Sequence, residues 1–481
     1  MEKVFLLFLD GVSYDFLSKA IKKGVMPNLS NIYENGFYSP LISTIPPQSP
    51  IAIPSLFSGQ TPGKHGSFGW SYVHDNKMKL INYRDIQTPM IWDILSKNEK
   101  KCVVYNIPCT YPPNKVNGVI VAGPPTPTND LITEPKQLSK LLELDIGKDV
   151  GDTDMADGDF YGSDRRQFVD KVLDIIKLQK KIIFYLMDEF KWDFFTAGIT
   201  VIDRVQHVLY GFSTEESPYY DEGIESELFS VYNLIDDLIY SIVEKIRDEA
   251  HFFIVSDHGF NYVERNIGLQ NILNSFQSKK SSISNIITIE KIKKLAQTLG
   301  INYSRGVVKK IATKIQPFIK REIDIQNSTC YTLDGGRVFV NKEKITDYEN
   351  YLKKLREYLL SYKNNEGEAV FDDVYYGSEL YIKNKIMPTP DIIVVPKTGY
   401  DIKTWNKDII EKIKITKNTT TQTGCHKDRS SRRGIFIYRN KDGLNLSSSQ
   451  IDIYDVCPTI MHIYKLHKNP EEYSGKNIII N

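Results

Sequence analysis

Three apolar runs in this 481-residue chain are each followed closely by an acidic residue, and this pattern constrains the fold most. The runs cover Val4–Leu9, residues 192–200 and residues 251–256. The first is apolar throughout, as a strand buried on both faces of a parallel sheet is, and we interpret the others as strands too. The acids that follow are Asp10, Asp203 and Asp257. Because ligands in open α/β sheets bind at the carboxyl ends of strands, these acids are candidates for chemistry.

Two histidines strengthen this interpretation. Asp257 is followed directly by His258, and two metal-binding residue types at one strand end are more specific than either alone. Asp203 and His207 are four residues apart, so on a helix they share one face and can reach one metal ion. Each signal has a plainer alternative, since Asp10 alone would serve as a helix cap and Asp203 with His207 as a surface hydrogen bond.

Residues 43–66 read STIPPQSPIAIPSLFSGQTPGKHG. Pro50 favours a helix start, because the missing N–H of a proline has no helical partner there. We therefore expect Ser49 at the N-cap of a short helix, where the positive end of the helix can hold an anion. Capping alone would explain Ser49 locally, and the Asp and His residues elsewhere in the chain favour a role in chemistry.

The totals exclude several classes of protein. A chain of this length predicts one large α/β domain with a substantial insertion, or two domains. The 61 basic and 60 acidic residues give a net charge of +1, so nothing electrostatic indicates a nucleic acid or an anionic membrane as partner. Five scattered cysteines without a CxxC pair argue against disulfides and a thiolate zinc site, and favour a reducing compartment.

The first apolar run is short and lacks the flanks of a signal peptide, and no later run has the length of a membrane span. We therefore expect a cytoplasmic location.

The composition changes after Phe260, where Lys, Ile, Asn and Ser become dominant until about residue 417. We expect a catalytic core of residues 1–259 and 418–481, with residues 260–417 as an inserted cap containing helices over 284–299 and 348–362 and a strand over 335–341. In the core, we expect helices over residues 14–23, 90–98, 165–181, 222–247 and 454–464, strands over 102–106 and 434–438, a turn at 26–28 and a surface loop over 107–128.

The candidate site residues are Asp10, Ser49, Asp203, His207, Asp257, His258 and His426, which precedes the expected strand over 434–438. Oxygen and imidazole ligands without cysteine suit Zn²⁺ or Mn²⁺, and six such ligands with one hydroxyl are enough for two ions. Two neighbouring ions can activate a nucleophile and hold the oxygens of a transferring phosphoryl group.

The ordered motifs resemble the alkaline phosphatase superfamily, and within it the type I phosphodiesterase/nucleotide pyrophosphatase-like phosphohydrolases. They include LDG at Asp10, MPNL at Met26, STIPPQS at Ser43, SGQTPGKHG at Ser58, IDRVQH at Ile202, SDHGF at Ser256 and HKDRSSRRGIF at His426. The resemblance implies a mostly parallel central sheet with helices on both faces and an inserted cap region.

The resemblance also implies roles for the site residues. One ion would be held by Asp10, Ser49, Asp257 and His258, and the other by Asp203, His207 and His426. Ser49 would attack phosphorus and form a covalent phospho-enzyme. The cofactors would be two divalent ions, Zn²⁺ first and Mn²⁺ second, and the partner a small phosphate ester.

Substrate class and chemistry stay partly open. Many diesterase relatives carry Thr where this chain has Ser49, so a phosphomonoesterase or a phosphomutase remains the alternative to a phosphodiesterase. No arginine stands out as a clamp for a monoester, with Arg84, Arg165, Arg166, Arg429, Arg432 and Arg433 as candidates. A sulfatase is excluded because residues 49–53 read SPIAI, without the Arg of the sulfatase pattern. A non-catalytic metal-binding protein is disfavoured because all seven positions hold competent residues.

Overall fold

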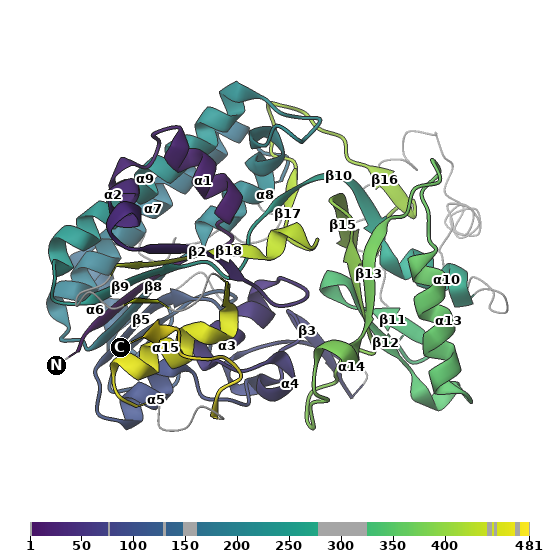
Figure 1. Cartoon of the computed structure of the whole chain (residues 1–481), viewed down its shortest axis with the longest axis horizontal. Coiled ribbons are helices and arrows are strands. Elements are labelled where there is room, and N and C mark those ends of the chain that lie inside the picture. The colour runs from purple at the N-terminus through teal and green to yellow at the C-terminus, as the bar shows by residue number, and fades with distance from the viewer. Residues whose placement is uncertain are drawn as a thin grey trace, which may run out of the picture.

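A nine-stranded sheet forms the centre of the molecule in the computed structural model, which describes residues 2–75, 77–127, 131–147, 161–277, 325–439, 445–446, 450–466 and 472–480 (Figure 1). In spatial order, the strands are β20 (Ile451–Asp452), β2 (Phe37–Ile42), β18 (Arg433–Arg439), β9 (His251–Val255), β1 (Val4–Leu9), β8 (Phe194–Ile199), β5 (Cys102–Ile107), β6 (Gly118–Ala122) and β7 (Thr133–Glu134). β18 runs antiparallel to β2 and β9, and β7 antiparallel to β6, whereas the other neighbours pair in parallel. The predicted mostly parallel sheet is confirmed.

Helices cover both faces of this sheet because alternate residues of its strands enter two separate cores. In β1, Phe5, Leu7 and Leu9 belong to one buried cluster, and Val4, Leu6 and Phe8 to the other. The first face carries α1 (Tyr14–Lys22), α2 (Pro27–Asn35), α6 (Gln137–Asp145), α7 (Arg165–Glu189), α8 (Val201–Ser213) and α9 (Glu222–Ile246). The second carries α3 (Ser49–Ser58), α5 (Ile91–Lys97) and α15 (Val456–Ile463), and α4 (Pro62–His65) follows α3.

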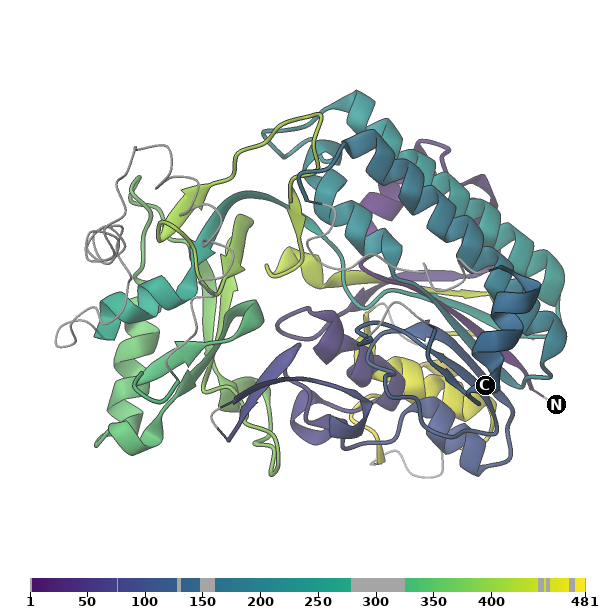
Figure 2. The same ribbon diagram turned by 180° about the vertical axis from the view of Figure 1, so that it is seen from behind.

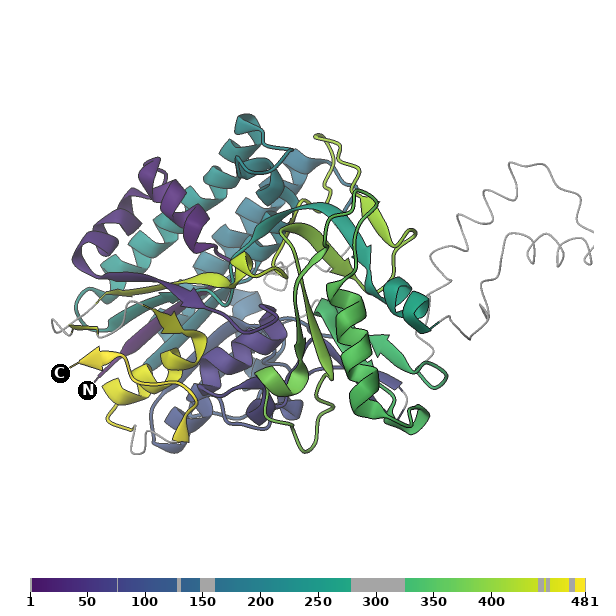
Figure 3. The same ribbon diagram turned by 45° about the vertical axis from the view of Figure 1, so that its right-hand side comes forward.

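A second region lies beyond one end of the sheet, as Figures 2 and 3 show from behind and from the side. It contains the sheet β11-β12-β14-β13 and the sheet β15-β10-β16, in which β17 also pairs with β10. Its elements are β10 (Asn261–Gly268), α10 (Leu269–Gln277), β11 (Cys330–Thr332), β12 (Arg337–Val340), α13 (Tyr348–Leu360), β13 (Phe371–Tyr376), α14 (Gly377–Leu380), β14 (Ile392–Pro396), β15 (Gly399–Lys403), β16 (Ile410–Lys412) and β17 (Gly424–Cys425). The helix expected over residues 284–299 lies outside the described residues.

Two further antiparallel strand pairs lie outside these sheets. β3 (Ser71–His74) pairs with β4 (Lys77–Leu80), and β19 (Asn445–Leu446) with β21 (Ile479–Ile480). Among the described residues, no helix combines the length and the apolar character needed to cross a membrane.

Three local predictions are wrong in instructive ways. Ser49 is the first residue of α3 and Gln48 takes the N-cap position, because the Gln48 carbonyl already accepts the N–H of Ala52 at 2.8 Å. The turn predicted at residues 26–28 is the start of α2, since the Asp236 carboxylate accepts the first free N–H groups of that helix. The predicted loop over residues 107–128 contains β6, whose apolar residues pair with β5.

Candidate active site

The predicted acids meet at the carboxyl edge of three neighbouring strands. β1 lies between β9 and β8 and is parallel to both. Asp10 follows β1, Asp257 follows β9, and Asp203 lies in the first turn of α8, directly after β8. All three are at most 5% exposed. The sheet topology therefore brings together residues that are up to 247 positions apart in the sequence.

Ser49 lies among the first group of candidates. Its Oγ is 3.4 Å from Oδ1 of Asp10 and 3.2 Å from Nε2 of His258. The same Nε2 lies 3.4 Å from Oδ2 of Asp257 and 3.8 Å from Oδ1 of Asp10. The N–H of Gly11 donates to the other Asp257 oxygen at 3.2 Å and so fixes that carboxylate.

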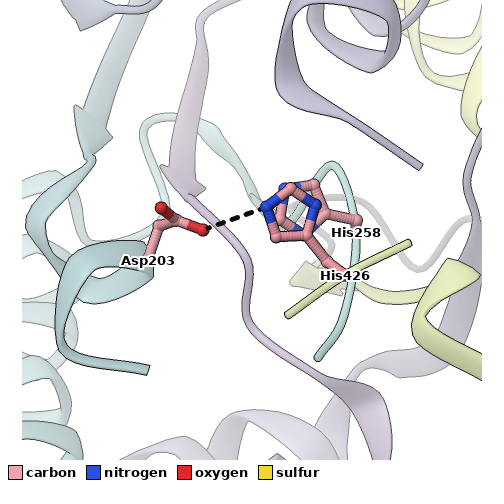
Figure 4. A group of neighbouring side chains, drawn as sticks. All are labelled: Asp203, His258 and His426. Atoms are coloured by element: carbon pink, nitrogen blue, oxygen red, sulfur yellow. Dashed lines mark ion pairs between the residues drawn. The ribbon is translucent and has the colours of Figure 1, made fainter. Parts of the chain in front are cut away.

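Asp203 is the centre of the second group. Its Oδ2 lies 3.5 Å from Nε2 of His207, one helical turn away, and its Oδ1 lies 3.8 Å from Nε2 of His426. Figure 4 shows His426 and His258 one over the other beside Asp203, with ring centroids 3.7 Å apart. The structure therefore brings together all seven residues selected from the sequence.

In all three imidazoles, Nδ1 faces a backbone carbonyl. Nδ1 of His207 lies 2.9 Å from the carbonyl of Gly424, that of His258 3.0 Å from the carbonyl of Gly259, and that of His426 2.8 Å from the carbonyl of Pro47. A carbonyl only accepts, so in the neutral form of each ring Nδ1 carries the proton and Nε2 keeps a lone pair. The three lone pairs point towards the carboxylates, as metal ligands would.

Burial keeps the imidazoles of His258 and His426 neutral. Desolvation lowers the pKa of His258 to about 4 and that of His426 to about 3, with the adjacent ring contributing in the latter. Desolvation, together with the nearby Asp203 carboxylate, raises the pKa of Asp257 to about 6. Burial acts to raise the pKa of Asp203 as well, but His207 and His426 outweigh it and hold that pKa below its ordinary value.

The donor set fits divalent cations. Oδ1 of Asp203 and Oδ2 of Asp257 are buried and accept no hydrogen bond from the described residues, which is costly for a carboxylate unless a cation lies beside it. The ligand atoms form two compact groups, Asp10–Asp257–His258 and Asp203–His258–His426, within each of which the atoms lie no more than 4.8 Å apart. His207 adds a further donor next to Asp203. Oxygen and imidazole donors of this kind suit Zn²⁺ or Mn²⁺.

Phe260 is a site residue that the sequence analysis did not select. Its ring centroid lies 4.9 Å from that of His207, 5.9 Å from that of His258 and 5.2 Å from that of His426. Gly11 makes room for this ring, because a Cβ at its φ of +73° would lie 2.6 Å from Phe260 Cε2. Phe260 therefore forms an apolar wall against all three imidazoles. Its place directly after the strand-end motif SDHG was the available signal.

The sequence analysis predicted only some of the arginine positions that matter near the site. Nη1 of Arg204 lies 3.5 Å from Oδ2 of Asp203, although Arg204 was not among the arginines proposed from the sequence. Four of those proposed are engaged elsewhere: Arg165 with Glu227, Arg429 with Asp373, Arg432 with the Ser43 carbonyl and Arg433 with Asp15.

The helix that carries Ser49 is secured by the residues that follow it. Pro54 lacks the N–H that would bond to the Pro50 carbonyl, and the hydroxyl of Ser67 donates to that carbonyl instead. His65 is fully buried, accepts the N–H of Ser67 at Nδ1, and lies 2.9 Å from the Ser55 hydroxyl through Nε2. His65, near the end of the motif SGQTPGKHG, together with Ser67, thus fixes α3 through hydrogen bonds to Ser55 and to the Pro50 carbonyl.

The second region contacts the site through a buried ion-pair group. The Asp401 carboxylate in β15 is fully buried and lies 2.6 Å from Nζ of Lys427, which follows His426 directly, and 2.6 Å from Nζ of Lys403. Burial acts to raise the pKa of Asp401, but the two ammonium groups hold it well below its ordinary value. Elsewhere, the hydroxyl of Tyr381 donates to the carbonyl of Ile45, four residues before Ser49.

Comparisons with solved structures show the fold. A phosphonoacetate hydrolase from Sinorhizobium meliloti 1021, in complex with phosphonoformate, is 13% identical over 97% of this chain and 95% of that chain, with a TM-score of 0.59. Murine ectonucleotide pyrophosphatase/phosphodiesterase 5, an inactive form in complex with AMP, is 13% identical over 98% and 96%, with a TM-score of 0.56. The human counterpart is 14% identical over 99% and 97%, also with a TM-score of 0.56. These are alkaline-phosphatase-like folds, as the sequence motifs implied.

A comparison with curated proteins gives no match. The profile of the family described as type I phosphodiesterase/nucleotide pyrophosphatase matches residues 4–424, which is most of the chain and contains six of the seven candidate site residues. The chain therefore belongs to the type I phosphodiesterase/nucleotide pyrophosphatase family and is a phosphoric ester hydrolase.

Proposed function

We propose that this enzyme hydrolyses phosphodiester or nucleotide pyrophosphate bonds through a covalent intermediate on Ser49, with two divalent metal ions as cofactors. The observation that carries the proposal is the position of the Ser49 hydroxyl, within 3.4 Å of both Asp10 and His258 in a cluster of imidazoles and carboxylates. One ion would be held by Asp10, Ser49, Asp257 and His258, and the other by Asp203, His207 and His426.

The chain's own residues set up the attack. Ser49 is the first residue of α3, so its hydroxyl lies at the positive end of a helix, where developing negative charge is favoured. When bound, two cations would lower the pKa of the serine hydroxyl and neutralise charge on the phosphate. Ser49 Oγ then bonds to phosphorus while the bond to the leaving alcohol or phosphate breaks. Water later cleaves the phospho-serine and restores the hydroxyl.

The engagement of the arginines supports diesters over monoesters. A monoester has an additional negative charge, which a free cation beside the phosphate would recognise. Four proposed arginines are engaged elsewhere, Lys427 is paired with Asp401, and Arg204 faces Asp203. We further propose that residues 260–417 form a cap on the core of residues 1–259 and 418–481, and that the enzyme acts in the cytoplasm, where its five free, buried cysteines remain reduced.

A paired substrate panel tests the substrate class. The purified enzyme is assayed with a bis-aryl phosphate and with the matching aryl monophosphate, each with Zn²⁺ and with Mn²⁺. We expect a higher kcat/KM for the diester. A monoester preference of about tenfold or more, equivalent to about 1.4 kcal/mol in the barrier, would instead assign a phosphomonoesterase or phosphomutase.

Metal analysis tests the cofactors separately. We expect about two ions per chain, loss of activity in chelator, and loss of one ion in His426→Ala with the fold retained. His462→Ala on α15 is the matched control and should keep both ions. Full activity in a protein that contains no metal would refute the two-ion site.

A further inference from the structure

Two short segments expose large apolar side chains to solvent. In β4, Met78 and Leu80 are each 63% exposed. In the loop after α14, Ile382 is 69% exposed and Ile386 75% exposed. Isolated exposed apolar residues are ordinary, but four on two neighbouring tips indicate a contact surface.

The two tips surround one buried cluster. Leu80 precedes Ile81, Ile382 follows Tyr381, and Ile386 precedes Met387; the three neighbours Ile81, Tyr381 and Met387 pack together in that cluster with Phe68. Figures 1 and 2 both place the β3–β4 hairpin and the loop after α14 along the same lower edge of the molecule. We call residues 77–80 and 382–386 together the lysine rim.

The loop of the rim is held in a fixed shape. The side-chain oxygen of Asn384 accepts the N–H groups of Ile386 and Met387 at 2.8 and 2.7 Å, and its Nδ2 donates to the carbonyl of Gly63 at 3.0 Å. Tyr381 and Asn384 are buried, whereas residues 382, 383, 385 and 386 are exposed to solvent. The isoleucines are therefore presented by a braced loop.

Lysines alternate with these apolar residues. Lys77, Lys79, Lys383 and Lys385 are all exposed, and none forms an ion pair with another described residue. Neither 77–80 nor 382–386 contains an acidic residue. Of the acids that flank them, Asp85 and Asp391 accept hydrogen bonds, Glu379 pairs with Arg356, and Asp75 lies beside His74. The net charge of +1 for the whole chain conceals this local concentration of positive charge.

We propose that the lysine rim docks the enzyme on an anionic lipid membrane. Apolar side chains that project among lysines match the interface of such a membrane, because the apolar tips enter the acyl boundary while the ammonium groups meet lipid phosphates. A protein partner fits less well, since the cores of protein interfaces are depleted in lysine. The proposal concerns the surface alone and does not depend on the chemistry at Ser49.

Vesicle sedimentation tests the proposal. The full-length enzyme is mixed with phosphatidylcholine vesicles, with and without phosphatidylserine, at low and high salt. We expect binding to the anionic vesicles that weakens with salt, and little binding to the neutral ones. Ile382→Ser with Ile386→Ser, and separately Lys383→Glu with Lys385→Glu, should each lower the partition coefficient about tenfold.

The control is Leu360→Ser on α13, which removes an exposed apolar side chain away from the rim and should leave binding unchanged. Turnover of a soluble aryl diester by all variants reports that they are folded. Equal binding to neutral and anionic vesicles, no binding at all, or a concentration-dependent dimer that the isoleucine variants abolish would overturn the proposal, the last by assigning the rim to a second copy of the chain.

Discussion

The carboxyl edge of the central sheet and the second region, β10 to β17, are stabilised in different ways. We call this second region the inserted region, because the chain leaves the central sheet after β9 and returns to it at β18. At the sheet edge, the candidate side chains are largely buried, each imidazole is fixed by a backbone carbonyl, and Phe260 packs against all three rings. The inserted region meets the core through polar contacts, among them Lys427 with Asp401 and the Tyr381 hydroxyl with the Ile45 carbonyl, and through the buried apolar cluster that contains Phe68, Ile81, Tyr381 and Met387.

The candidate site residues and the inserted region therefore belong to different parts of the fold. The seven candidate residues lie just after strands or on α3 and α8, where the buried surroundings fix their rotamers. The inserted region contributes none of the seven candidate site residues, so we expect changes there to alter stability and substrate affinity before they alter the chemical step.

The largest effect is expected for Ser49→Ala. If Ser49 is the nucleophile, as we propose, its removal should lower kcat by about a thousandfold or more, while carboxylates and imidazoles still hold the metal. Steady-state kinetics and metal analysis on the same preparation measure both. Ser55→Ala, in the same helix but bonded to His65, is the control and should retain most activity. Normal turnover by the Ser49→Ala variant would place the nucleophile elsewhere.

Asp401→Asn tests the inserted region. The change leaves two lysines facing an uncharged group, and breaking a buried pair costs about 3 kcal/mol or more of stability. Because the pKa of Asp401 is lowered in the folded enzyme, its contribution is complete above the ordinary Asp pKa and is lost as the pH falls below it. Urea unfolding at neutral and acidic pH should show a gap between wild type and variant that closes in acid. Glu379→Gln, in a partly exposed pair with Arg356, should cost far less.

His65 provides a pH test within the core. Burial lowers its pKa to about 3, so the unfolded chain binds the proton first and stability falls as the pH drops below about 6.5. At pH 5 the loss amounts to about 2 kcal/mol. The glutamine of His65→Gln has no titratable group. The difference in unfolding free energy between wild type and variant should therefore shrink by about 2 kcal/mol between about pH 7.5 and pH 5. A constant difference would mean that His65 has the same pKa in the folded enzyme as in the unfolded chain.

The smallest effect is expected for Phe260→Leu, at the junction of the two regions. Loss of the aromatic wall leaves every ligand in place but loosens three imidazoles, which should weaken metal affinity roughly tenfold. Competition against a chromogenic chelator measures it. Phe276→Leu, an aromatic residue packed within the inserted region, is the matched control and should not change metal affinity. Equal affinities for the two variants would show that Phe260 only fills space.

The sequence predicted the parts of this enzyme in which local pattern and global topology agree. Apolar runs identified β1, β8 and β9, and parallel pairing placed Asp10, Asp203 and Asp257 at one edge. The position of Phe260 after a strand does not show that it packs against His207, His258 and His426, because these three rings come from separate segments of the chain. The ion-pair and hydrogen-bond partners of the arginines could not be predicted either, because residues that pair across the fold have no fixed spacing in the sequence. Misplacing the start of α3 by one residue followed from treating Ser49 as a cap when the Gln48 carbonyl already accepted the first helical bond.

The two ends of the inserted region lie side by side, because Asn261 pairs with Cys425 and Tyr262 with Gly424 in antiparallel strands. The entropy of closing this loop is therefore set by a hairpin-like junction and grows only slowly with the length of the chain between its ends. Changes in the length of that segment should therefore add little to the entropic cost of folding, provided that its contacts with the core are kept. His258 precedes this junction and His426 follows it, so the paired strands hold the two stacked imidazoles together whatever the length of chain between them.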